Sequence, residues 1–545
     1  MPDDVPPPDE TPPPPEPPPG VPLPEDSDAA TLLVNAILLA GGSTFYDLQE
    51  RCLVAVPTPA GIETLPLRSQ RLRHHLVALG HDLYERAPRP SDVRRVLELL
   101  GAIAVRSLTV ELHNRFAFVN DAVWIDLADG SGRAISIDDS GWRLVEQPPV
   151  SFRHHGHQRP LPLPAADGSL SLLTDLLNLR SDDDRLLVVA WLTWATFAGV
   201  VHPILLLVGP PGSTKTTAAM LLRRAVDPSI LDAIEAPRQR AELAQVLDQN
   251  AIVPLDNISR LDQRETDLLC KAVSGGVFPK RKLTTDDDSV FLRLKRAVIM
   301  TAIPIPTKAP DFLDRCLRIE VRPPRSRRLE REIWATFERS APAILGAVLD
   351  LVSAAMRELP HVAIPDEFRL VDFAQWGEAV AIAMGHEPGR FVDAYRRNMA
   401  AVADEAVLAD PVANAIRKLA DRGDWHGTCL QLLGVLAVHA DPHDRREWPP
   451  SETALGMRLS VLGPALARSG IEVHRFRGPP PLRPRIVRIR RIPAGARNTD
   501  EAGVQGVQGV HRRGNGGNGG GGTGGRKGLV SEPRLLPPHG PQREA

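Results

Sequence analysis

A glycine-bracketed loop that leads into a Lys-Thr pair is the segment of this chain best suited to chemistry. Residues 204–208 are apolar and long enough for a buried strand, and residues 218–225, rich in alanine and leucine, favour a helix. Between the two lie Gly209, Pro210, Pro211, Gly212, Ser213, Thr214, Lys215, Thr216 and Thr217. A strand, a glycine loop, Lys-Thr and a helix form a phosphate-binding P-loop, in which backbone N–H groups and the lysine bind phosphates and the following hydroxyl binds Mg²⁺. The segment therefore predicts a site for ATP and Mg²⁺.

Thr214 departs from the usual P-loop pattern, which has glycine directly before the lysine. Thr214 can serve if its backbone is helical, so that the helix begins one residue early. The alternative interpretation of the segment is a glycine turn with a purely structural role.

A second apolar stretch ends in an acid. Residues 251–255 predict a strand, although Pro254 is unusual inside one, and Asp256 and Asn257 follow it. In a P-loop protein an acid at this place completes the Mg²⁺ site with Thr216. Asn257 cannot accept a proton, so it would position the attacking water, or hydrolysis would be slow.

A third predicted strand, residues 297–301, ends in Thr301, which would lie where a polar side chain contacts the γ-phosphate. The alternative is a core strand with a polar end. Arg315 follows at the place from which ring-forming ATPases extend an arginine finger to the neighbouring subunit. The alternative for Arg315 is an ion pair with Asp314 at the surface, with Arg318 similarly paired.

Two basic clusters suggest contact with nucleic acid. Lys280, Arg281 and Lys282 precede an acidic run in a hairpin-like segment, so they would contact DNA phosphates inside a ring or pair with those acids. Near the C-terminus the sequence predicts helices at 412–420 and 428–438, with residues 425–428 beginning the second, and a third at 451–468 with Ser451 as its N-cap. Two short strands follow, and this pattern is typical of a winged helix. Its last strand carries Arg485, Arg488 and Arg490, which would contact DNA; the alternative is an arginine-rich or protein-binding surface.

Composition limits the class of protein. The chain has 545 residues and a net charge of −2, so any basic surface must be local. Its four cysteines are widely separated, which argues against a disulfide framework or a zinc site and fits a reducing cytoplasm. No signal peptide is evident. The apolar stretch 186–208 is long enough to span a membrane, but His202-Pro203 divides it, so we expect a buried helix followed by a buried strand.

Composition shifts divide the chain into seven segments. They are a proline-rich acidic tail (1–27), an α+β domain of unknown role (28–150), a connector (151–180), the P-loop domain (181–325), a helical region (326–408), the winged helix (409–492) and a glycine-rich tail (493–545). Both tails are expected to be disordered. No primase signature is evident in residues 28–150.

The order of these motifs resembles a known family. GPPGSTKTT, LDNIS, LLCKAVSGG, TTDDDSVFL and LDRCLRIEV follow one another as in a family of actinobacterial ATP-binding proteins of phages and integrated elements. That family is similar to superfamily 3 helicases and to the helicase part of phage primase–helicases, within the AAA+ group. The resemblance covers about residues 140–490. It implies phosphate and Mg²⁺ binding by Lys215, Thr216 and Asp256, action of Arg315 across a subunit interface, and a homo-oligomer such as a hexameric ring.

Together, these features predict an α/β P-loop NTPase of AAA+ type with a C-terminal winged helix. We expect a cytoplasmic, DNA-dependent ATPase or helicase in the replication of a phage or mobile element. One alternative is an ATP-dependent DNA-binding regulator that hydrolyses slowly. Another is a monomeric small-molecule kinase indifferent to DNA.

Overall fold

The computed structural model divides the chain into two compact units, of which the first ends at Val110 and the second begins at Glu111. It describes residues 28–58, 61–237, 239–281, 289–326, 328–438, 448–478 and 483–492; for 61, 279–281, 289–291 and 293 the backbone alone is described. This division lies at 110, whereas the sequence predicted a domain boundary at 150. The predictions for the tails 1–27 and 493–545 concern residues outside the described ranges.

The first unit packs three helices against a small antiparallel sheet. Its elements are α1 (Ala29–Leu39), β1 (Ser43–Tyr46), β2 (Cys52–Thr58), β3 (Gly61–Pro66), α2 (Gln70–Tyr84) and α3 (Pro90–Ala104). The sheet has the order β1-β2-β3. Leu33, Val54, Leu72 and Leu100 are fully buried in one core, so this unit has an apolar interior of its own.

The second unit begins with a four-stranded antiparallel sheet. Its strands are β5 (Phe116–Val119), β6 (Ala122–Asp126), β7 (Ala134–Asp138) and β8 (Gly141–Val145), in that order, and β4 (Leu112–His113) pairs with β9 (Ser151–Phe152). Val123, Ile125 and Ile135 are buried in the same core as Val348 of helix α10 (Glu330–Glu358). Because this sheet completes the core of the second unit, it does not belong with the helices that precede it in the sequence.

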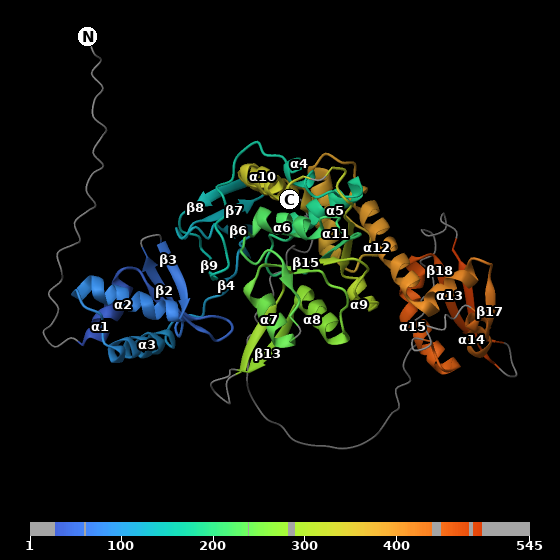
Figure 1. Ribbon diagram of the computed structural model, residues 1–545, viewed down its shortest axis with the longest axis horizontal. Coiled ribbons are helices and arrows are strands. Elements are labelled where there is room, and N and C mark those ends of the chain that lie inside the picture. The colour runs from blue at the N-terminus through green and yellow to red at the C-terminus, as the bar shows by residue number, and fades with distance from the viewer. Residues whose placement is uncertain are drawn as a thin grey trace, which may run out of the picture. The chain divides into compact units, whose positions relative to one another are not determined.

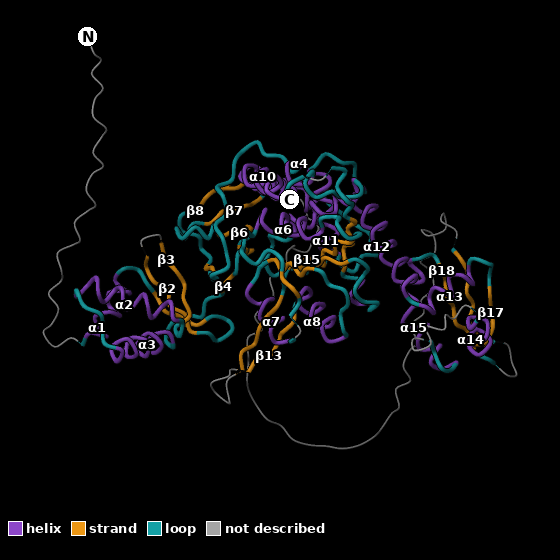
Figure 2. The backbone as a smooth tube through the Cα atoms, viewed as in Figure 1, coloured by secondary structure: helices purple, strands orange, loops and turns teal. Residues whose placement is uncertain are grey.

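The centre of the second unit is a five-stranded parallel sheet with the order β11-β12-β15-β10-β16. Helices cover both of its faces (Figures 1 and 2). The strands are β10 (Ile204–Val208), β11 (Ile234–Glu235), β12 (Ile252–Asp256), β15 (Ala297–Ala302) and β16 (Cys316–Glu320); the helices connected to them are α4 (Ser171–Thr174), α5 (Asp182–Trp194), α6 (Lys215–Val226), α7 (Arg240–Gln249), α8 (Gln263–Ser274) and α9 (Pro310–Leu313).

Alternation along β10 explains why its sequence is uniformly apolar. Leu205 and Leu207 face the core shared with α5, α6 and α10, whereas Ile204, Leu206 and Val208 face the core shared with α7, α8 and α9. A strand buried on both faces needs apolar residues at every position. The predicted strand and the buried helix before it, α5, are therefore confirmed, and all of Leu186 to Trp194 is buried.

The strand order places a crevice at the carboxyl end of β10. From β10 the chain crosses to β11 at one edge of the sheet, whereas from β15 it passes beyond β10 to β16 at the other edge. Where successive connections diverge in this way, the ends of the strands form the usual ligand-binding crevice of an open α/β sheet.

A hairpin and a helical region complete the central part. The hairpin consists of β13 (Gly276–Arg281) and β14 (Ser289–Leu294); the helical region consists of α10, η1 (Leu359–His361), α11 (Val371–Ala383) and α12 (Arg390–Ala409). Within the described residues one helical segment, Glu330–His361, is long and apolar enough to cross a membrane, and 56% of its apolar window is buried inside the protein.

The C-terminal part of the second unit combines three helices with a three-stranded sheet. Its elements are α13 (Pro411–Ala420), β17 (Trp425–Thr428), α14 (Cys429–Ala437), α15 (Glu452–Arg468), β18 (Ile471–Arg477) and β19 (Arg485–Arg491). The sheet has the order β17-β19-β18. Ser451 caps α15 as predicted, by accepting a hydrogen bond from the N–H of Ala454. Residues 425–428 were expected to begin a helix, but they form β17, which pairs with the centre of β19.

Candidate nucleotide site

The loop between β10 and α6 depends on two glycines for its shape. Gly212 has φ +77°, a left-handed conformation that side chains disfavour. At Gly209 the limit is space, since a Cβ atom there would lie 2.3 Å from the carbonyl oxygen of Val321. Ser213 is fully buried beneath the loop, whereas Pro211 is exposed. The loop is therefore wrapped tightly around the end of β10, with Ser213 inside it and Pro211 at its surface.

Thr214 takes the conformation of the glycine that it replaces. Its φ and ψ are 61° and 27°, so it is left-handed and precedes the helix. The expectation that Thr214 begins the helix one residue early is wrong, because α6 begins at Lys215. The Thr214 hydroxyl accepts a hydrogen bond of 3.1 Å from the side-chain amide of Asn178, which itself has φ 51°. Sequence reasoning did not identify Asn178, since nothing in the pattern connects residues that far apart.

The Lys215 ammonium lies over the loop. It donates to the carbonyl oxygens of Gly209 at 2.8 Å and Pro210 at 3.1 Å, and to the hydroxyl of Ser213 at 3.4 Å. Partial burial lowers the pKa of Lys215, while the nearby Asp256 carboxylate opposes this shift. Thr214 makes no side-chain cap, so the first N–H groups of α6 are left for another acceptor. A cation and free N–H donors at one point suit an anionic ligand.

Asp256 accepts hydrogen bonds from hydroxyl groups on two other elements. Its Oδ1 accepts hydrogen bonds from Thr216 on α6 at 2.8 Å and from Thr301 on β15 at 2.6 Å. Thr301 is buried, and its oxygen also accepts from the backbone N–H of Asn257 at 2.8 Å. The register of the strands brings Asp256 close to Thr301, because Leu255 pairs with Met300. It also places Thr301 beside Leu207, near the end of β10. The structure therefore brings together Thr216 and Asp256, which the sequence assigned to one Mg²⁺ site, and adds Thr301, which the sequence assigned to the γ-phosphate.

The oxygen atoms of Thr216 and Asp256 fit a hard divalent cation. Mg²⁺ prefers oxygen ligands and is held in proteins by one or two side chains, water and substrate phosphate. A hydroxyl and a carboxylate 2.8 Å apart beside a helix N-terminus are a donor set of this kind. Thr217, in the first turn of α6, is half-buried.

Asn257 lies beside the pair, exposed, with φ 55°. Asparagine tolerates this left-handed backbone better than most residues, and the conformation turns the chain directly after β12. Its side chain is neutral, so it has no means of accepting a proton at ordinary pH.

Arg315 lies at the other end of the strands from the loop. Its carbonyl oxygen accepts from the N–H of Ile204, the first residue of β10, so Arg315 stands at the amino ends of the strands. Its guanidinium donates to Ser274 at 2.8 Å and pairs with Asp311 at 2.5 Å, and its side chain is only 12% exposed. Arg315 therefore does not join the loop of its own chain, and its partner is Asp311 rather than the expected Asp314.

The basic residues proposed for DNA contact belong, where the structure describes them, to other elements than those of this site. Lys280 and Arg281 lie in β13, where the backbone alone is described, and Lys282 lies outside the described residues. Arg485, Arg488 and Arg490 lie in β19 of the C-terminal part. Arg488 and Arg490 share one face of the strand, whereas Arg485 lies on the other. Arg488 pairs with Asp424 and Arg490 pairs with Glu472.

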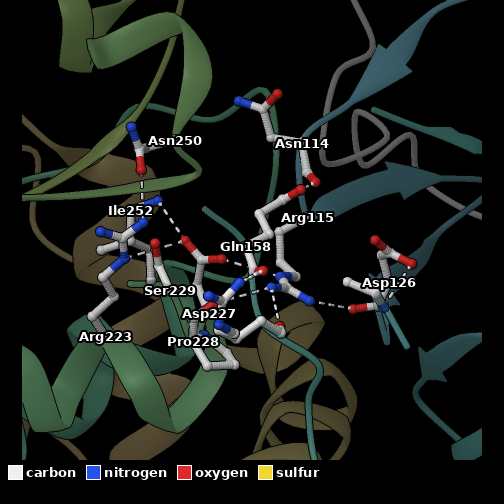
Figure 3. Close-up of polar contacts among 12 residues, drawn as sticks. Asn114, Arg115, Asp126, Gln158, Arg223, Asp227, Pro228, Ser229, Asn250 and Ile252 are labelled. Atoms are coloured by element: carbon white, nitrogen blue, oxygen red, sulfur yellow. Dashed lines mark hydrogen bonds and ion pairs between the residues drawn. The ribbon is translucent and has the colours of Figure 1, made fainter. Parts of the chain in front are cut away.

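A buried ion network fixes the far end of α6 (Figure 3). Arg115, fully buried, donates to Asp227 at 3.0 Å and to the backbone oxygens of Asp126, Arg159 and Pro228 at 3.0, 2.8 and 3.2 Å. Asp227 follows the last residue of α6, and its second oxygen accepts from the N–H of Ile252 at the start of β12. The helix that begins at Lys215 is thus attached at its other end to both the four-stranded sheet and the central sheet.

A second arginine extends this network. Arg223 of α6 lies 3.7 Å from Asp227 and donates to Asn250 at 2.7 Å and to the carbonyl oxygen of Leu231. Each buried charge here has an opposite charge or a carbonyl oxygen beside it, as the cost of burial demands.

Comparisons with known proteins find two matching family models. Residues 170–405 match the family model described as the actinomycete integrative conjugative element replication protein, and residues 412–502 match the AICE RepA C-terminal domain. Across these two ranges the chain is therefore similar to replication proteins of mobile elements, as the resemblance in the motifs predicted. The matches meet near the end of α12, where the C-terminal part begins.

Solved structures give more distant likenesses. They include "The A form apo structure of NrS-1 C terminal region-CTR", at 11% identity and a TM-score of 0.39, covering 84% of this chain and 98% of that chain. They also include "SCCmec type IV Cch - active helicase", at 11% identity and a TM-score of 0.44, covering 83% of this chain and 92% of that chain. None of the curated proteins matches the chain.

Proposed function

We propose that this protein binds Mg²⁺-ATP at the loop between β10 and α6 and hydrolyses it during replication of a mobile element. The observation that carries the proposal is the contact of Thr216 with Asp256, 2.8 Å apart, directly beside Lys215. Residues 209–217 would hold the phosphates through backbone N–H groups, and the Lys215 ammonium would exchange its loop carbonyls for phosphate oxygens. The class is then a P-loop ATPase of AAA+ type.

Thr216 and Asp256 would hold Mg²⁺, which neutralises phosphate charge when it is bound. Thr301 would act through Asp256, because its hydroxyl already donates to that carboxylate and accepts from Asn257. This role differs from direct contact with the γ-phosphate. The side-chain amide of Asn257 would orient the attacking water from its exposed position beside Asp256.

Arg315 would serve a neighbouring subunit. It lies at the amino ends of the strands, whereas the loop lies at their carboxyl ends, so it cannot reach the phosphates of a nucleotide bound to its own chain. In a ring-shaped homo-oligomer, such as a hexamer, it would face the adjacent site after release from Asp311. Such an assembly, with the C-terminal part acting as a winged helix on DNA, would be a DNA-dependent ATPase or helicase.

One observation favours a second function, an ATP-dependent DNA-binding switch with slow hydrolysis. The residue after Asp256 is the neutral Asn257, and Arg315 is engaged in an ion pair. Asn257 could orient the attacking water but not take its proton, and Arg315 would first have to leave Asp311, so hydrolysis would be slow. A monomeric small-molecule kinase has no observation in its favour here.

The test measures ATP hydrolysis with and without single-stranded DNA, for the unmodified chain and for Lys215→Ala. We expect DNA to stimulate turnover and Lys215→Ala to abolish it. ATP binding with turnover that DNA does not stimulate would favour the switch. Turnover that survives Lys215→Ala would show that the proposed site is wrong.

A further inference from the structure

The outer face of the C-terminal sheet carries an unusual set of side chains. Directly opposite residues of antiparallel strands share a face, so the register groups His426, Arg488 and His474 in one row across β17, β19 and β18. The next row of the same face contains Thr428, Ile486 and Phe476.

The other face of this sheet is the one that packs on the helices. Val473 and Ile489 pair there, and Val487 pairs with Arg475. Val487 and Ile489 are buried, and Arg475 donates to the carbonyl oxygen of Gly456 on α15 at 2.6 Å. The rows that contain His474 and Phe476 therefore face away from the core.

Two aromatic rings lie together on this outer face. His474 and Phe476 are stacked, with ring centroids 5.9 Å apart and planes 29° from parallel. Phe476 is 41% exposed although it is a large apolar side chain. Exposed rings on a basic surface are what proteins use to stack on unpaired bases, and such stacking does not depend on sequence.

Positive charge that is free to bind phosphate lies at the end of the hairpin. Arg477 pairs across the strands with Arg485, and both are exposed. Alternation along the strands places this pair on the face of Val473 and Ile489, opposite to that of Phe476, but at the end of the hairpin, where neither side chain is covered. Neither forms an ion pair with any residue in the described parts of the chain, unlike Arg488 and Arg490. Two like charges set directly opposite repel each other, so a bound phosphate would relieve a cost that the free protein carries.

Helix α15 is poorly suited to reading a duplex. Its Arg458 pairs with Asp410 and its Arg468 pairs with Asp314, so neither is free. Its exposed positions include Met457 and Val461. A helix that enters the major groove needs cations for phosphates and donors for base edges, whereas the exposed side of α15 offers only the hydroxyls of Thr453 and Ser460.

We infer that the outer face of the β17-β19-β18 sheet binds single-stranded DNA. Bases would stack on Phe476 and His474 on the outer face. Arg477 and Arg485 adjoin Phe476 and Ile486 on the other face, and they would contact the backbone phosphates where the DNA strand passes over the end of the hairpin. In a duplex the bases are stacked on one another, so these rings would have no partner there. The inference rests on the proposed action on DNA and adds to it the form of DNA and the residues that hold it.

The test uses the full chain and fluorescence anisotropy with a labelled oligothymidine and a duplex of equal length. We expect tighter binding to the single strand. Phe476→Ala should weaken that binding by about fivefold to 150-fold, the loss of one stacked base, and Phe476→Leu should weaken it similarly because leucine has no π face. Arg490→Ala, on the same face but paired with Glu472, is the matched control and should change little.

Salt dependence tests the arginines separately. Replacing Arg477 and Arg485 together by alanine should reduce the slope of log affinity against log salt by about 1.4, the value for two phosphate contacts on a single strand. Circular dichroism and thermal unfolding of each variant confirm that the fold is retained. The inference is overturned if Phe476→Ala binds the single strand as tightly as the unmodified chain, or if the duplex binds equally well.

Failure of the ATP site would be distinguishable from failure of this inference. Lys215→Ala removes the loop lysine but leaves the C-terminal sheet intact, so it should bind the oligothymidine normally without nucleotide. A chain that binds the oligonucleotide through Phe476 but does not bind ATP would contradict the proposed ATPase alone.

Discussion

Removing the hydroxyl of Thr301 should weaken Mg²⁺-dependent nucleotide binding without affecting the loop. Thr301→Val keeps the shape of the side chain but removes the donor to Asp256 at 2.6 Å and the acceptor of the Asn257 N–H at 2.8 Å. Thr301 is buried, so water does not readily replace either hydrogen bond. The Asp256 carboxylate would then be less firmly oriented.

The size of this effect follows from the position of Thr301 behind a metal ligand. Loss of a group that orients a ligand typically costs 10-fold to 100-fold in metal affinity, which is about 1.4–2.8 kcal/mol. The hydrogen bond to the carboxylate is charge-assisted, and such a bond contributes about 1.5–3 kcal/mol, which agrees with that range. Lys215 and the loop N–H groups are untouched, so binding of ATP without Mg²⁺ should not change.

The assay titrates a fluorescent ATP analogue with Mg²⁺ and, separately, with excess chelator. Thr301→Val should lose affinity in Mg²⁺ alone, and Thr301→Ser, which keeps the hydroxyl, should behave as the unmodified chain. Equal loss with and without Mg²⁺ would mean that Thr301 contacts the nucleotide itself. No loss in either condition would refute the role assigned to its hydroxyl.

Three further changes test other parts of the structure. Thr214 has a left-handed backbone, so the Thr214→Gly variant should be more stable than Thr214→Ala by about 1 kcal/mol in chemical denaturation. Both variants lose the hydrogen bond from Asn178, and only glycine relieves the strain of the backbone. Equal stability of the two variants would contradict this. Arg115→Met should lower the free energy of unfolding by about 3–5 kcal/mol, because it leaves Asp227 buried with only Arg223 as a nearby cation. Adding Asp227→Asn to this variant should recover part of the loss. A loss below about 1 kcal/mol in Arg115→Met would show that the pair is dispensable. Burial lowers the pKa of His202 from 6.5 to about 3, so between these pH values the unfolded chain binds a proton that the folded chain does not. As the pH is lowered through this range, the free energy of unfolding should decrease by about 1.4 kcal/mol per pH unit more than in His202→Gln. Parallel pH profiles of the two proteins would refute this.

The sequence predicted the local parts of the site because their patterns are local. A uniformly apolar strand, a glycine loop and a helix are read directly from residues 204–226, and the structure has β10 and α6 there. The meeting of Thr216 with Asp256 was also predicted, because acids at the ends of parallel strands lie at one edge of a sheet.

Backbone conformation and long-range pairing could not be predicted in this way. The left-handed backbone of Thr214 depends on the loop around it, and its contact with Asn178 joins residues that no motif relates. The Arg115–Asp227 pair likewise joins distant parts of the chain, and either residue alone reads as an ordinary surface charge. Pro254 was unexpected in a strand, but β11 pairs only with the two residues after it.

Domain boundaries were the least predictable feature. Residues 28–150 were predicted as one α+β domain, because composition does not reveal that β5, β6 and β7 share a core with α10 more than two hundred residues later. The sheet β1-β2-β3 of the first unit was missed, and residues 425–428 were assigned to a helix because they adjoin one. In each case the partner that decides the structure is remote in sequence.

The most direct measurement of the ATP site is calorimetric titration of Mg²⁺-ATP into the full chain and into Lys215→Ala. We predict saturable binding of one nucleotide per chain by the unmodified protein and its loss, or a large weakening, in the variant, which should unfold at the same temperature without ATP. Equal affinity of the two proteins, or no binding by the unmodified chain, would contradict a triphosphate site at the end of β10.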